Sequence, residues 1–138
     1  MEISKAAITA IHGLVYLANN GSETLMDVRK IADDLAIPYG YLAKILQRVS
    51  RSHLIDSVRG PHGGYRLALD PAKISLQNII ESVDGPVVVG RCELAPGSQC
   101  RRFDRCKIRR QLDKVKKQAW EAYGEITLDK FSDQFLSV

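Results

Sequence analysis

A short segment rich in glycine and proline most restricts how this chain can fold. Residues 59–64 read Arg-Gly-Pro-His-Gly-Gly and permit backbone angles that most residues avoid. The segments on either side, 53–58 and 65–69, have the composition and alternation of short strands. Because two strands joined by such a turn form a β-hairpin, the sequence predicts a hairpin over residues 54–69.

Three helical patterns precede the hairpin, over residues 4–19, 26–35 and 39–51. Apolar residues recur at helical spacing within each pattern, and turn signals separate them. Two short helices joined by a tight turn are typical of a helix-turn-helix, whose second helix enters the DNA major groove. A hairpin directly after such a pair makes a winged helix. The predicted fold class is therefore mostly α with a small β-hairpin wing; an ordinary three-helix core with a solvated face is the alternative.

The outer side of the third helix and the tip of the hairpin carry the side chains that we expect to contact DNA. Polar, basic and aromatic groups on this helix can donate hydrogen bonds or stack, opposite a buried apolar stripe. Arg59 at the hairpin tip can enter a narrow minor groove, whose negative potential attracts arginine; a merely solvated turn is the alternative. We expect base or phosphate contacts above all from Lys44, Gln47 and Arg48. The full predicted set is Tyr39, Tyr41, Lys44, Gln47, Arg48, Arg51, Arg59 and His62.

The chain after Cys106 carries an apolar residue every three or four positions, which is the seam of a heptad pattern. Charged residues fill the positions between, so the apolar stripe is narrow and needs a partner. We expect this long helix to join two copies into a homodimer through Ile108, Leu112, Val115, Ala119, Ala122 and Ile126.

The chain divides into three predicted parts. Residues 1–84 form the winged helix-turn-helix domain, which ends in a short helix over 76–83 with Ser75 as its N-cap. Residues 85–106 form a cysteine loop. Residues 107–138 hold the long dimerisation helix and a last helix over 128–135, for which Thr127 is the predicted cap.

The composition narrows the class of protein further. The 138 residues suit one domain or one domain with an extension, and 45% of them are hydrophobic, enough for a core. A net charge of +4 permits a nucleic-acid partner without demanding one. We find no signal-peptide pattern and no apolar run of the ~20 residues that span a bilayer, so we expect a cytoplasmic protein without a membrane partner. No Ser/His/Asp, Cys/His or phosphate-binding glycine arrangement indicates an enzyme.

The only three cysteines, Cys92, Cys100 and Cys106, lie in the loop between the winged helix and the long helix. An odd number cannot all pair in internal disulfides, and cytosolic thiols stay reduced. Clustered cysteines in such a protein indicate metal, cluster or redox chemistry. Structural zinc sites typically contain closely spaced cysteine pairs, which this loop lacks. Zinc and a cluster-free thiol switch are the alternatives to a cluster.

Several motifs resemble one family of bacterial regulators. Residues 57–65 read Ser-Val-Arg-Gly-Pro-His-Gly-Gly-Tyr, Tyr41-Leu42 lies in the third helix, and Ile126-Thr127-Leu128 follows the long helix. With the cysteine loop, these motifs are similar to the Rrf-type family of dimeric winged-helix regulators that includes the iron–sulfur assembly regulator IscR and the nitric-oxide-sensing repressor NsrR. The resemblance covers nearly the whole chain. It implies a homodimer on double-stranded DNA with a pseudo-palindromic operator, and an iron–sulfur cluster, 2Fe-2S or 4Fe-4S, held by Cys92, Cys100 and Cys106.

The chain departs from that family at the fourth cluster ligand. IscR-like members place a histidine three residues after the third cysteine, where this chain has Arg109; NsrR-like members place an acidic residue in the first helix, where it has Ile8. The spacing between Cys92 and Cys100 is also longer than in close relatives. His12 lies one turn after Ile8 on the same helix face, and a neutral imidazole is a competent iron ligand. We therefore predict His12, donated across the dimer, as the fourth ligand.

Both the fourth ligand and the function have alternatives. His12 can instead be a core or interface histidine, and Glu93, Asp104, a water or a small thiol can complete the site. Taken together, the sequence predicts a dimeric transcriptional regulator that senses redox state, nitric oxide or iron–sulfur status through its cluster. A thiol- or zinc-based regulator without a cluster and a winged-helix scaffold that binds no DNA are the competing hypotheses.

Overall fold

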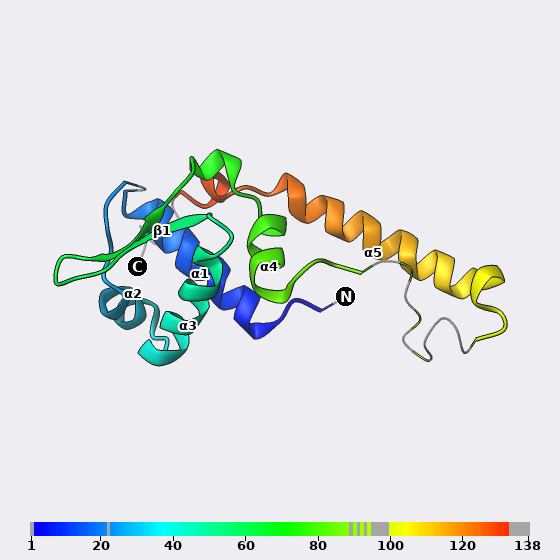
Figure 1. Ribbon diagram of the computed structural model, residues 1–138. Coiled ribbons are helices and arrows are strands. Elements are labelled where there is room, and N and C mark those ends of the chain that lie inside the picture. Colours follow the sequence, from blue (N-terminus) through cyan, green and yellow to red (C-terminus); the bar gives the residue numbers. More distant parts are fainter. Residues whose placement is uncertain are drawn as a thin grey trace.

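The computed structural model describes residues 2–21, 23–88, 90, 92, 94 and 100–132. A winged-helix body contains the first four α-helices and the hairpin, and α5 projects from it as a long arm (Figure 1). This architecture confirms the predicted fold class. The main elements are α1 (Lys5–Asn19), α2 (Val28–Leu35), α3 (Tyr39–Ser50), β1 (Ile55–Val58), β2 (Gly64–Leu67), α4 (Leu76–Asp84) and α5 (Lys107–Glu125), with short 3-10 helices η1 (Pro71–Lys73), η3 (Phe103–Arg105) and η4 (Leu128–Phe131).

The core of the body forms where α1 packs against α3 and α4. The α1 helix begins after Ser4, whose hydroxyl accepts a hydrogen bond from the Ala7 amide (3.0 Å). The predicted apolar stripe of α3 is buried as expected and meets the buried face of α1. The largest fully buried side chains include Leu14, Leu17, Ile31, Leu42, Leu46 and Ile79.

The second helix begins two residues later than its apolar pattern predicts. Met26 is not helical because it forms an antiparallel bridge with Tyr65 of the wing, through amide–carbonyl hydrogen bonds of 2.8 and 2.9 Å. Asp27 then caps α2 by accepting a hydrogen bond from the Arg29 amide at 2.7 Å. The wing is therefore tied to the segment in front of the helix-turn-helix as well as to its own partner strand.

The predicted hairpin is present, with Ile55 opposite Leu67 and Val58 opposite Gly64. Its first strand starts later than predicted because His53 adopts a left-handed backbone conformation (φ 62°). Gly64 lies so close to the preceding segment that a Cβ there would sit 2.3 Å from the Met26 carbonyl oxygen. Only glycine permits this approach. Gly63 is required by a separate contact, because a Cβ there would sit 2.0 Å from the Val58 carbonyl oxygen.

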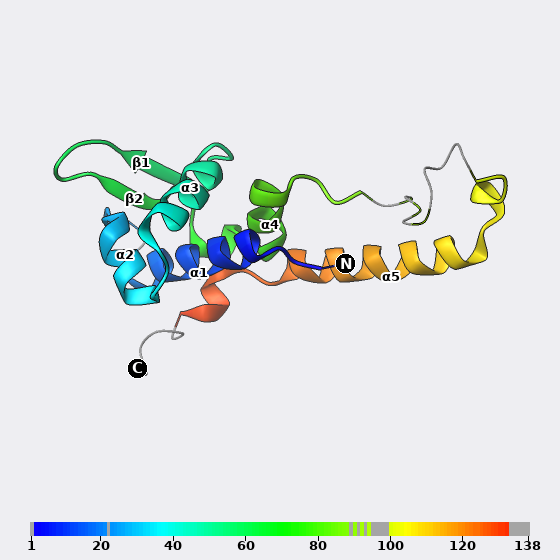
Figure 2. The same cartoon turned by 90° about the horizontal axis from the view of Figure 1, so that it is seen from below.

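The α5 arm leaves the body with its N-terminal end farthest away (Figure 2). None of its residues is buried in the single chain. Beyond α5 the chain returns to the body, where Leu128 is buried and η4 packs on α1. No helix in the described part of the chain is both long and apolar enough to cross a membrane.

The end of the chain differs from the prediction in two respects. Instead of an α-helix over 128–135, residues Leu128–Phe131 form a 3-10 helix, and residues 133–138 lie outside the described part. Thr127 occupies the cap position without capping, because its hydroxyl donates to the Asp129 carboxylate. Its backbone pairs with Ser75 in an antiparallel bridge, which anchors this segment to the start of α4.

Candidate nucleic-acid interface and cysteine site

A groove of about 550 Å³ runs between α3 and the wing. Side chains from both elements line it, so the fold brings together residues as far apart in the sequence as Tyr39 and Tyr65. Basic and hydrogen-bonding groups on two sides of a concave surface suit the phosphates and base edges of DNA. Five residues of the predicted DNA-binding set line this groove: Tyr39, Lys44, Gln47, Arg51 and Arg59.

The other three predicted DNA contacts lie elsewhere. Tyr41 and Arg48 are seven residues apart and share a different side of α3. The Lys5 ammonium lies 5.7 Å from the centre of the Tyr41 ring, and Arg48 donates a 3.4 Å hydrogen bond to the Val83 carbonyl on α4. His62 is exposed in the wing loop but does not line the groove. From the sequence alone we expected the polar residues of this helix to form one DNA-binding surface. In the structure, the packing of α1 and α4 divides them into two separate surfaces.

Two aromatic or basic residues near the groove escaped the sequence reasoning. The Arg29 guanidinium lies over the Tyr39 ring, 4.6 Å from its centre, and so joins α2 to α3 at the groove. Tyr65 lines the groove; its burial, and next its neighbour Tyr39, raise the pKa of its phenol. Arg29 could have been predicted from the sequence as a residue near DNA, since the first helix of a helix-turn-helix crosses the DNA backbone. The position of Tyr65 in the groove could not have been predicted, because it depends on the long-range bridge to Met26.

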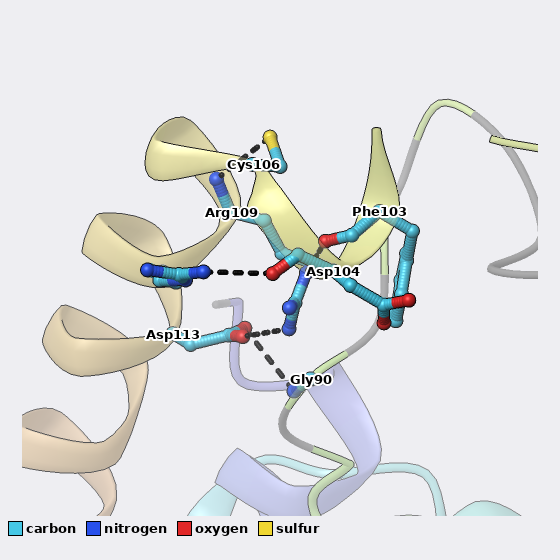
Figure 3. A network of polar contacts seen from close by, with 7 residues as sticks. Gly90, Phe103, Asp104, Cys106, Arg109 and Asp113 are labelled. Atoms are coloured by element: carbon cyan, nitrogen blue, oxygen red, sulfur yellow. Dashed lines mark hydrogen bonds and ion pairs between the residues drawn. The ribbon is translucent and has the colours of Figure 1, made fainter. Parts of the chain in front are cut away.

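The cysteine site lies at the far end of α5. Cys106 is the N-cap of α5, and its Sγ accepts a hydrogen bond from the Arg109 amide at 3.4 Å (Figure 3). Cys92 and Cys106 line a common pocket of about 160 Å³ on α5, together with Ile108 and Leu112. Cys100 is not among the residues that line this pocket. All three thiols are free and partly buried.

The predicted ligand set is gathered only in part. No three His, Cys, Asp or Glu side chains within the described residues form a group that could hold a metal ion. His12 is exposed on α1, one turn after the exposed Ile8, whereas Cys106 caps the end of α5 that lies farthest from the body (Figures 1 and 2). A contribution of His12 would therefore come from a second copy of the chain. Of the two alternative protein ligands, Glu93 lies outside the described residues and Asp104 is exposed in η3.

Arg109, which stands where a ligand histidine would be in IscR-like proteins, is fully engaged in structural contacts. Its guanidinium pairs with the Asp113 carboxylate at 3.0 Å and donates to the Phe103 carbonyl at 3.1 Å. It also lies 4.2 Å from the centre of the Phe103 ring. Asp113 in turn accepts a hydrogen bond from the Gly90 amide at 3.1 Å. These contacts join the two ends of the cysteine loop to the first turns of α5 (Figure 3).

The predicted dimer seam is uncovered in the single chain. Ile108, Leu112 and Val115 are 74%, 55% and 60% exposed, an unusual degree for three aligned apolar residues. Ala122 is also exposed, whereas Ala119 and Ile126 are partly buried near the body. Close to the body α5 packs against α4, where Gln77 donates a hydrogen bond to the Trp120 carbonyl at 3.0 Å. The free part of the seam is therefore the half that also carries the cysteine pocket.

Comparison with known proteins gives consistent matches along nearly the full chain. Residues 3–134 match the family model named Rrf2 and described as an iron-dependent transcriptional regulator. A candidate HTH-type transcriptional regulator of Aquifex aeolicus is 32% identical over 130 residues, which cover 93% of this chain and 89% of the relative.

Two solved structures have the same fold. The IscR structure from T. potens has a TM-score of 0.77 at 25% identity and covers 97% of this chain and 88% of its own. CymR (YrzC), the global cysteine regulator of B. subtilis, has a TM-score of 0.73 at 24% identity and covers 97% and 98%. At that identity the second match supports the fold alone.

Proposed function

The chain belongs to the Rrf2 family of transcriptional regulators, and from this membership we propose that it binds operator DNA as a homodimer and senses a signal at its cysteines. Members of this family are transcriptional regulators rather than enzymes. The observation that carries the proposal is the groove between α3 and the wing, which gathers Lys44, Gln47, Arg51 and Arg59 on one surface.

DNA would meet this surface with α3 in the major groove and Arg59 of the wing near the minor groove. Gln47 can read a base edge with both the carbonyl oxygen and the amino group of its side-chain amide. Lys44 and Arg51 supply positive charge to the phosphates. Arg29 holds the Tyr39 ring at the edge of the same surface. Arg48, which bonds to α4, and His62, which lies outside the groove, are weaker candidates than the sequence alone indicated.

Dimerisation through α5 follows from the exposed seam of Ile108, Leu112 and Val115. An arm with a narrow apolar stripe and no buried residue is stable only when another surface covers that stripe. A second copy of α5 offers the same stripe, and two-fold symmetry then places two reading surfaces on a pseudo-palindromic operator with half-sites about one helical turn apart.

An iron–sulfur cluster is the sensing group that fits the donor chemistry best. Three thiols belong to one loop of the sequence, and two of them share a pocket that lies on the proposed dimer seam. Cys92, Cys100 and Cys106 would hold the group, with Cys100 moving toward the other two, and His12 of a second copy would supply the fourth ligand. When bound, the cluster supplies an iron centre that reacts with oxygen or nitric oxide and changes charge on oxidation.

A thiol-based regulator without a cluster is the second candidate. One specific observation favours it: Cys92 and Cys106 lie in one pocket while Cys100 does not share it. Two neighbouring thiols can respond to oxidants or to soft metals without a third ligand.

Anaerobic purification followed by absorption and Mössbauer spectroscopy separates the two candidates. The cluster proposal predicts visible thiolate-to-iron absorption and a Mössbauer spectrum that identifies the cluster type. Cys100→Ser should abolish both signals, whereas Ser98→Ala in the same loop should leave them unchanged. Protein that stays colourless after reconstitution with iron and sulfide would exclude the cluster and leave the thiol-based candidate. A gel shift with DNA from upstream of its own gene distinguishes a DNA-binding regulator, which should shift the fragment, from a winged-helix scaffold that binds no DNA.

A further inference from the structure

Side-chain contacts of Arg109 and Asp113 hold together the base of the cysteine loop. We propose that Arg109 and Asp113 form a clamp that fixes the spacing of the Cys92 and Cys106 thiols before any metal binds. The inference deepens the proposed function and rests on it, since a prearranged thiol pair matters only if the loop is a sensing site.

The clamp connects the two ends of the loop through one ion pair. Asp113 accepts the Gly90 amide with one carboxylate oxygen and the Arg109 guanidinium with the other, at 3.1 and 3.0 Å. Gly90 lies two residues before Cys92, so this carboxylate fixes the incoming end of the loop. The outgoing end is fixed by Arg109, which bonds to the Phe103 carbonyl and stacks on its ring.

Cys106 itself belongs to the clamp through the main chain. Its Sγ accepts the Arg109 amide hydrogen bond, so the residue whose side chain closes the loop also orients the sulfur. Cys92, two residues after Gly90, lines the same pocket of about 160 Å³ as Cys106. A conformation that is already ordered loses less entropy when a bridging group binds both sulfurs.

The burial of the ion pair distinguishes it from other pairs on the same helix. The side chains of Arg109 and Asp113 are only 17% and 15% exposed. Lys117 and Glu121 form another i,i+4 pair on α5, at 4.0 Å, with side chains 70% and 62% exposed. An exposed pair of this kind contributes little, whereas removing one partner of a shielded pair leaves the other charge without compensation. Glu121→Gln is therefore a matched control.

A trivalent arsenical, phenylarsine oxide, tests the clamp without iron. It condenses with two neighbouring thiols: two As–S bonds form, both thiol protons leave with the arsenic-bound oxygen as water, and arsenic stays trivalent. In a Cys100→Ser protein only Cys92 and Cys106 remain to bridge. Intact mass identifies the one-to-one adduct, and competition with a monothiol measures its apparent affinity.

The clamp predicts specific differences between variants made in this background. Arg109→Gln should weaken arsenical binding roughly 10-fold. Arg109→Lys should weaken it similarly, because lysine keeps the charge but cannot both stack on Phe103 and bond to two acceptors. Glu121→Gln should bind like the parent. Hydrogen exchange of the Gly90 amide should accelerate in Asp113→Ala and stay slow in Glu121→Gln. Unchanged exchange of the amides of α1 and α3 in Asp113→Ala would show that the loop opens while the body remains folded.

Equal arsenical affinity in the parent and in Arg109→Gln would overturn the clamp, and so would a parent that forms no bridged adduct. The two proposals fail separately. Protein that binds no iron but keeps the Arg109-dependent adduct contradicts the cluster and not the clamp. Protein that binds a cluster equally well with Arg109→Gln, and whose adduct is unaffected, contradicts the clamp and not the cluster.

Discussion

Replacing Gly64 with alanine tests how the wing is attached to the helix-turn-helix. A Cβ at this position would lie 2.3 Å from the Met26 carbonyl oxygen and 2.6 Å from the carbonyl carbon, so the backbone itself must move. The two hydrogen bonds between Met26 and Tyr65 would then be lost or lengthened. Gly64 also has φ +152°, a conformation that L side chains rarely adopt.

The expected loss of stability follows from two contributions, the lost hydrogen bonds and the unfavourable backbone conformation. Two backbone hydrogen bonds contribute roughly 1–3 kcal/mol together, and the unfavourable backbone conformation costs about 1–3 kcal/mol. Gly64→Ala should therefore lower the free energy of unfolding by roughly 2–6 kcal/mol, which is a large part of a typical total of about 5–15 kcal/mol. We expect a fall in Tm of about 10 °C or more for a chain of this size.

Gly60→Ala is the control that separates the steric contact from the backbone conformation. Gly60 also has a positive φ, +115°, but an added Cβ there would meet nothing within 4 Å. Urea denaturation of both variants should show Gly64→Ala less stable than Gly60→Ala by at least ~1 kcal/mol, the contribution of the lost hydrogen bonds. Equal stabilities would refute the idea that the bridge from Met26 anchors the wing.

Three other expectations concern DNA binding, assembly and pH. Lys44→Ala should weaken binding to all DNA sequences alike and reduce the slope of log affinity against log salt by about one, measured by fluorescence anisotropy; a sequence-dependent loss would mean a base contact instead. Leu112→Glu should raise the dimer dissociation constant roughly 30-fold or more in sedimentation experiments, because about 2 kcal/mol is lost at a seam position that the dimer buries. Gln111→Glu should leave the constant unchanged. A Leu112→Glu dimer of normal affinity would place the interface elsewhere. Burial first, and then the hydrogen bond to Asp34, raise the pKa of Tyr16 to about 12. Because the unfolded chain loses this proton first, the contribution of Tyr16 to stability should be complete below pH 10 and be lost between pH 10 and 12. The alkaline fall in stability, followed by urea denaturation, should be smaller in Tyr16→Phe, and an equal fall in both proteins would contradict this role.

The sequence was sufficient for the elements whose packing is encoded locally. The stripe of Leu42, Ile45, Leu46 and Val49 predicted the buried face of α3, because helical periodicity alone determines which residues share a side. The glycine-rich turn predicted the hairpin because few other conformations suit its residues. The exposed seam was likewise readable as an apolar stripe that its own chain leaves uncovered.

Contacts between residues far apart in the sequence could not be predicted from the periodicity of apolar residues. The bridge from Met26 to Tyr65, which delays the start of α2, joins residues that no local pattern connects. The division of the polar residues of α3 follows from where α1 and α4 pack, so Tyr41 and Arg48 could not be separated from Lys44 in advance. Arg109 was recognisable only as a non-ligand, since its bond to the Phe103 carbonyl depends on the turn formed by η3.

The affinity of one protein preparation for operator DNA, before and after the cysteine site is emptied, tests the central proposal most directly. Fluorescence anisotropy under anaerobic conditions, first with the reconstituted protein and then after iron removal by a chelator, gives both dissociation constants at one salt concentration. A sensing regulator predicts constants that differ by roughly 5–150-fold, because a signal acts only through different affinities of two states. Tight binding with equal constants in both states would contradict sensing at the cysteines, and absence of binding to any upstream fragment would contradict the assignment of the groove to DNA.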